Sequence, residues 1–147
     1  MIAHLNDSQA IRKFGYALGL FLYQVHWYRP IRVVVSWGDK QLAKSLSPGL
    51  SFYGVDAYHV GQLPQTVMPA MLSELRADYG VVFAALPESE GKTGIHILAD
   101  AGDRVPDKTE RAITDLMATL PEPAPQPPID RTQFYSTCRQ GLEGQTR

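Results

Sequence analysis

The sequence lacks the features that mark secreted, nucleic-acid-binding and membrane proteins. Cys138 is the single cysteine among 147 residues, so no disulfide can form within the chain and we expect a cytoplasmic protein. Basic and acidic residues nearly balance, at 14 and 15, and the formal net charge is -1. Without a basic excess, the chain has no electrostatic basis for binding nucleic acid or an anionic membrane.

Long apolar runs are also missing. Residues 16–28 are fairly apolar, but this stretch is too short to cross a bilayer and contains Gln24 and His26. The polar first nine residues have neither the basic start nor the apolar centre of a signal peptide. We therefore expect no membrane span and no secretory leader. The composition, with 44% hydrophobic and 20% charged residues, is typical of one globular domain with a true core.

Hydrophobic periodicity predicts an alternation of helices and strands. Apolar residues that recur at three and four positions predict a first helix that begins near Gln9 and ends before Pro30. Strands are predicted at residues 31–36, 55–60, 80–85 and 94–98, and further helices at 42–50, 66–77 and 106–117. Pro48 should bend or shorten the second helix, and Gly54 is placed to close it.

This order of elements predicts an α/β fold. We expect a three-layer α/β/α sandwich around a four-stranded mixed sheet that is mostly parallel, with one strand paired directly to its predecessor. The chain divides into this domain at residues 1–119, a proline-rich linker at 120–129 and a tail at 130–147. The tail is predicted to include a short helix that uses Phe134, Tyr135 and Leu142.

The strand at residues 81–85 is the natural place to look for chemistry. It is wholly apolar, which suits a strand covered on both faces. The loop after such a strand lies at the carboxyl edge of the sheet, where α/β proteins bind their ligands. Here the loop contains Leu86, Pro87, Glu88 and Ser89, a set that is poorly equipped for catalysis.

Several segments, taken in order, resemble the first domain of the α-D-phosphohexomutases, and the bacterial phosphoglucosamine mutases most closely. The similar segments cover roughly residues 8–118 and carry the apolar first strand and a series of glycine-marked turns. They are the runs at 31–35, 49–50, 54–56, 63–66, 79–82, 93–96 and 105–106, with Gly61 and Gly102. The resemblance implies the fold predicted above.

The resemblance also implies that catalysis is lost. Members of the family carry a phosphoserine in a Ser-His-Asn-Pro loop, which exchanges a phosphoryl group with a sugar phosphate beside Mg2+. In the gapless register Leu86 stands at the serine, and Pro87, Glu88 and Ser89 stand at the next three positions. Leucine has no nucleophilic oxygen, and Ser89 lies about 10 Å further along an extended chain. The family's metal loop and sugar-binding loops belong to later domains.

The remaining polar candidates have ordinary structural explanations. The four histidines, His4, His26, His59 and His96, are scattered without a cysteine partner or an i,i+4 pair. Asp100, Asp103 and Asp107 could hold a cation, but turn and capping roles explain them better. Asp39 with Lys40 is better explained as a turn with an exposed ion pair than as a ligand remnant. We therefore predict no metal and no cofactor.

Aromatic residues near element ends are the better functional candidates. Aromatic side chains are favoured at protein interfaces, although packing in the core or at its edge is the simpler explanation for them. The interface candidates are Trp27, Tyr28, Trp37, Phe52, Tyr53 and Tyr58, with Leu86 at the tip of the degenerate loop.

We therefore expect a catalytically inactive interaction, structural or assembly module that binds another protein or itself. A homodimer or larger homo-oligomer is implied by the resemblance. The alternative is a sugar-phosphate-binding subunit or one part of a split mutase. A fragment of a longer protein is a third interpretation.

Overall fold

The computed structural model describes residues 7–27, 29–37, 40–85, 93–120 and 130–134. The helices and strands occur in the predicted order as far as residue 119. They are α1 (Ser8–Val25), β1 (Ile31–Ser36), α2 (Lys40–Lys44), α3 (Ser47–Phe52), β2 (Val55–Gly61), the 3-10 helix η1 (Gln65–Val67), α4 (Met68–Leu75), β3 (Tyr79–Ala85), β4 (Thr93–Ala99), α5 (Asp107–Thr119) and β5 (Thr132–Phe134).

The strands form one mixed sheet in the order β4-β3-β1-β2-β5. β1 pairs in parallel with both β2 and β3, and β4 pairs antiparallel with β3 from Tyr79↔Ala99 to Ala85↔Thr93. The α/β class and the mostly parallel sheet with one antiparallel hairpin are thus confirmed.

The predicted strand count was wrong, because the sheet has five strands instead of four. Thr132 to Phe134 pair in parallel with Ala57 to His59 of β2. The helix predicted for the tail is absent from residues 130–134; the rest of that prediction lies outside the described residues. A three-residue segment carries too little periodicity to reveal a strand, and its partner lies about 75 positions away in the sequence.

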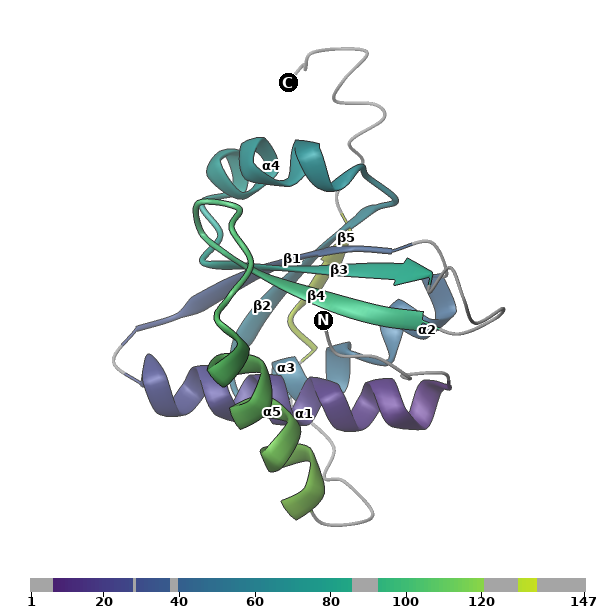
Figure 1. Cartoon of the computed structure of the whole chain (residues 1–147), viewed down its shortest axis with the longest axis vertical. Coiled ribbons are helices and arrows are strands. Elements are labelled where there is room, and N and C mark those ends of the chain that lie inside the picture. Colours follow the sequence, from purple (N-terminus) through teal and green to yellow (C-terminus); the bar gives the residue numbers. More distant parts are fainter. Residues whose placement is uncertain (1–6, 28, 38–39, 86–92, 121–129, 135–147) are drawn as a thin grey trace.

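Helices cover both faces of the sheet, which makes the three layers visible in Figure 1. One face carries α4, and its core includes Val34, Met68 and Leu72. The other face carries α1, α3 and α5, and its larger core includes Phe14 and Val33. Alternate residues of β1 enter opposite cores, as the twofold period of a strand requires.

The crossing of α1 and α3 depends on glycine. A Cβ added at Gly49 would collide with the backbone nitrogen of Tyr16, and one at Gly15 would lie 2.6 Å from the Leu46 carbonyl oxygen. Both separations are far below van der Waals contact, so only glycine permits so close an approach. Gly19 of α1 meets Gly49 in the same way.

Local signals explain where the helices begin and end. Asp7 caps α1, and its carboxylate accepts a hydrogen bond from Ala10 N at 2.8 Å. Pro48 divides the predicted second helix into α2 and α3. Gly54 follows the C-cap residue Tyr53 and has φ of +76°, which confirms its predicted role as a closing glycine.

Candidate functional site

The carboxyl edge of the sheet is where the predicted catalytic loop is attached. β1, β2 and β3 end there at Ser36, Gly61 and Ala85, and β4 begins there at Thr93. The four loop residues Leu86, Pro87, Glu88 and Ser89 lie outside the described residues. The attachment points of the loop therefore agree with the prediction, whereas its geometry is not described.

An aromatic cluster with a buried histidine occupies this edge beside β5. His59 of β2 is 1% exposed, and its ring lies 6.4 Å from that of Trp37 and 5.0 Å from that of Phe134. The Lys40 ammonium sits over the Phe134 ring at 4.8 Å. Among the described residues, neither ring nitrogen of His59 has a hydrogen-bond partner, and the same holds for Trp37 Nε1.

Burial is the main influence on His59. It lowers the pKa of the imidazole from 6.5 to about 4, with Asp130 opposing the shift and Lys40 and Lys44 adding to it. His59 is consequently neutral at pH 7. The ring has no hydrogen-bond partner in the described part of the chain, and its contacts there are packing against the rings of Trp37 and Phe134.

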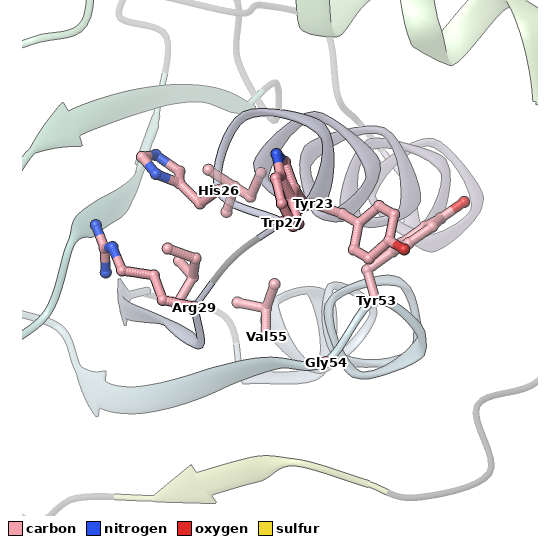
Figure 2. Close-up of a pocket in the computed structure, with 9 residues that line it drawn as sticks. Tyr23, His26, Trp27, Arg29, Tyr53, Gly54 and Val55 are labelled. Atoms are coloured by element: carbon pink, nitrogen blue, oxygen red, sulfur yellow. The ribbon is translucent and has the colours of Figure 1, made fainter.

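A second candidate site lies at the opposite, amino edge of the sheet. Figure 2 shows a pocket between the end of α1, which contributes Tyr23, His26 and Trp27, and the α3–β2 turn, which contributes Tyr53 and Val55. Its volume is about 140 Å3. Pockets for organic ligands usually enclose about 300–1,000 Å3, so this one suits a single side chain better than a sugar phosphate.

Polar groups form one wall of this pocket. Arg29 Nη1 donates to Asp78 Oδ1 at 2.9 Å, and Asp78 Oδ2 accepts from the backbone nitrogen of Arg32 at 3.0 Å. His26 Nε2 lies 3.0 Å from the Tyr79 hydroxyl. Burial lowers the pKa of His26, and the Arg29 charge adds to that shift while Asp78 opposes it. The wall is thus held by long-range contacts that join the segment between α1 and β1, and Arg32 of β1, to Asp78 and Tyr79 at the start of β3.

Three aromatic side chains, Tyr23, Trp27 and Tyr53, line the pocket, and Phe52 lies beside Tyr53. Trp27 is 74% exposed and Tyr23 is 54% exposed. The Tyr23 ring lies 6.0 Å from that of Tyr53, which meets Phe52 edge-on at 5.0 Å. We call Tyr23, Trp27, Phe52 and Tyr53 the aromatic face. Tyr53 is half-buried, whereas the other three are exposed, and exposed aromatic side chains near one pocket are typical of an interaction surface.

The structure separates the predicted interface residues into three sets. Trp27, Phe52 and Tyr53 come together on the aromatic face. Trp37 lies at the other edge beside His59, and Tyr58 lies under Arg32, whose guanidinium is 5.8 Å from its ring. Tyr28 and Leu86 lie outside the described residues.

Sequence reasoning missed Tyr23 and Phe134. Tyr23 is four positions before Trp27 and directly follows Leu22 of the buried stripe, so pairing exposed aromatics at helical spacing would have found it. Phe134 was predicted only as part of a tail helix, because its contacts with His59 and Lys40 depend on β5 joining the sheet.

The predicted polar candidates have structural roles or no described contact. Asp103 accepts a hydrogen bond from Ala99 N through its backbone oxygen, in the turn that includes Asp100, and Asp107 begins α5. His96 is half-buried, and burial lowers its pKa. Within the described ranges, no three His, Cys, Asp or Glu side chains are grouped to hold a metal ion. His4, Asp39 and Cys138 lie outside those ranges.

The protein-family comparison identifies the ancestry of the chain. Residues 6–124 match the family model described as phosphoglucomutase/phosphomannomutase, alpha/beta/alpha domain I. The chain belongs to this family. The resemblance found in the sequence is thereby confirmed, and the matched part includes every described element except β5.

Curated relatives of this domain-I chain are phosphoglucosamine mutases. Those of Arthrobacter sp. (strain FB24) and Corynebacterium diphtheriae are each 33% identical, over 95 and 100 residues. The alignments cover 65% and 66% of this chain but only 21% and 22% of the relatives. The chain therefore spans about a fifth of the length of these mutases.

Solved structures share the fold of this domain-I chain. A phosphoglucomutase/phosphomannomutase family protein from Burkholderia thailandensis has a TM-score of 0.67 at 19% identity, covering 93% of this chain and 31% of that structure. A putative phosphomannomutase from Thermus thermophilus has a TM-score of 0.70 at 18% identity, covering 90% of this chain and 30% of that structure.

No helix among the described residues is long and apolar enough to cross a membrane.

Proposed function

We propose that this domain-I chain is a non-catalytic interaction and assembly module that binds through its aromatic face. The observation that carries the proposal is the exposure of Trp27 and Tyr23 around a pocket of about 140 Å3. Interface hot spots are enriched in tryptophan and tyrosine and centre on pockets that accept one side chain. The partner is a second copy or another protein.

The residue at the start of the degenerate loop supports the non-catalytic part of the proposal. In the resemblance register Leu86 stands where the family has its phosphoserine, so the chain has no nucleophile at that position.

The aromatic face can be tested by removing its most exposed ring. We expect Trp27→Ala to weaken association at least tenfold, measured by light scattering across a concentration series, or by capture of a partner. Because the ring is 74% exposed, the free energy of unfolding should change by less than about 0.5 kcal/mol.

Gln24→Ala is the matched control, because Gln24 is exposed on the same final turns of α1. It should leave both association and stability unchanged. A protein that is monomeric at every concentration and captures nothing, or a Trp27→Ala variant that associates like the wild type, would contradict the proposal.

The second candidate function is sugar-phosphate binding, alone or as part of a split mutase. It is favoured by the family match and by Lys40 at the carboxyl edge, where family ligands would be expected. The test is thermal unfolding with hexose phosphates at millimolar concentration. We expect no upward shift of Tm, because the Lys40 ammonium already lies over the Phe134 ring at 4.8 Å. A concentration-dependent shift would favour the second candidate.

A further inference from the structure

Positive charge is concentrated in the segment that builds α1, α2 and α3. Residues 8–55 contain a single acidic residue, Asp39, whereas thirteen of the fifteen acidic residues follow Val55. Neither α1 nor α3 contains an aspartate or a glutamate. The same segment contains six basic residues, Arg12, Lys13, Arg29, Arg32, Lys40 and Lys44. The aromatic face therefore belongs to the basic part of a nearly neutral chain.

Arg12 lies at one end of the aromatic face. Its guanidinium carbon is 5.9 Å from the centre of the Tyr16 ring, and that ring is 5.9 Å from the Phe52 ring. Tyr16 is buried, whereas Phe52 is exposed. The buried tyrosine thus packs against both a cation and an exposed ring, and a guanidinium is attracted to an aromatic ring at this distance.

Arg29 lies at the other end, in the wall of the pocket. Figure 2 shows its side chain on one side of the pocket and those of Tyr23 and Tyr53 on the other. The ion pair with Asp78 holds the guanidinium in place, while 40% of the Arg29 side chain stays exposed. The other Asp78 oxygen accepts from the backbone nitrogen of Arg32. An arginine fixed in this way can bind a carboxylate of a partner with little loss of side-chain freedom.

The separation of the two arginines sets the length of a partner segment. From Arg12 to His26, which lines the pocket, the helix rises by roughly 21 Å. An extended segment of about six residues covers that length, and so does a helix of about 14 residues. Such a segment can place one apolar side chain in the pocket and its carboxylates beside the arginines.

We propose that the aromatic face binds an acidic segment of another protein, in which carboxylates flank one apolar or aromatic side chain. The inference rests on the proposed interaction function and adds the chemistry of the partner. Charge complementarity identifies the occupant, because arginines lie at both ends of the face and the helices that form it contain no carboxylate. Complementary charges speed association and select against basic competitors.

Fluorescent peptides of about 14 residues test the charge of the partner. Each has a central leucine, phenylalanine or tryptophan, flanked by glutamates in one set, by lysines in the second and by serines in the third. We expect at least one glutamate peptide to bind the full-length chain about tenfold more tightly than every lysine or serine peptide, measured by fluorescence anisotropy. Raising NaCl from about 50 to about 300 mM should weaken this binding about threefold, because salt screens the charges.

Substitution of Arg12 tests the site itself. Arg12→Gln should weaken binding of the best glutamate peptide about fivefold, and Arg12→Lys should restore most of the affinity because the charge returns. Lys108→Gln is the matched control, because it removes an equal charge from an exposed position of α5 outside the aromatic face. Urea denaturation checks that each variant is folded. Equal losses in Arg12→Gln and Lys108→Gln would overturn the proposal, since net charge alone would explain the binding.

The same measurements separate this proposal from the proposed interaction function. If Trp27→Ala weakens association but no glutamate peptide binds more tightly than the other peptides, the acidic partner is overturned and the interaction function stands. If a single-stranded oligonucleotide of about 15 thymidines binds more tightly than every glutamate peptide, and Arg12→Gln weakens it, the occupant is a nucleic acid and the proposal is overturned. A wild-type chain that neither associates nor binds any peptide would overturn both.

Discussion

The His59 imidazole is buried and has no hydrogen-bond partner among the described residues, and its burial makes the protonated form unfavourable in the folded protein. The pKa is about 4 in the folded protein and 6.5 when the ring is exposed, so the unfolded chain binds the proton more tightly. Stability is therefore fully present above pH 6.5 and is lost as the pH falls toward 4.

We expect the free energy of unfolding to fall by about 2 kcal/mol between pH 7 and pH 5 through this residue alone. Urea titrations followed by tryptophan fluorescence would measure the loss. His59→Phe removes the titrating group while keeping a ring of similar size. Between pH 7 and pH 5 the free energy of unfolding of this variant should therefore fall by about 2 kcal/mol less than that of the wild type. Equal declines in wild type and variant would show that His59 does not control the pH dependence.

Among the helices and strands, the close crossing of α1 and α3 is the contact most sensitive to an added side-chain atom. Gly49→Ala would place a methyl group against the backbone nitrogen of Tyr16, and the helices must separate to admit it. We expect a loss of about 3 kcal/mol in the free energy of unfolding, measured by urea denaturation.

Gly54→Ala is the matched control for this crossing. Nothing lies within 4 Å of an added Cβ at Gly54, and the cost comes only from its φ of +76°, about 1 kcal/mol. If both substitutions cost the same, the crossing does not depend on close backbone contact.

The strand β5 was not predicted from the sequence. Thr132 to Phe134 have no amphipathic period of their own, and the strand exists because Asp56, Ser51 and His59 provide partners for it. These partners lie about 75–80 positions away along the chain. A hydrophobic pattern within a few residues carries no information about contacts between positions so far apart.

At the scale of the whole molecule, both faces of the sheet are covered and each has its own core. The α/β domain therefore has the requirements for folding without the later domains of its relatives. We expect a single cooperative transition in urea, with coincident midpoints by circular dichroism and by tryptophan fluorescence. Two separate midpoints would show that the layers unfold independently.

The sequence by itself determined the order of helices and strands through α5, the antiparallel hairpin and the family, because periodicity, caps and glycine-marked turns are local features. It also predicted Trp27, Phe52 and Tyr53 among the interface candidates. Only the tertiary structure brought these three together with Tyr23, separated Trp37 and Tyr58 from them, and added β5 to the sheet. Those outcomes depend on contacts between distant segments, which are fixed when the helices pack on the sheet and β2 pairs with the tail.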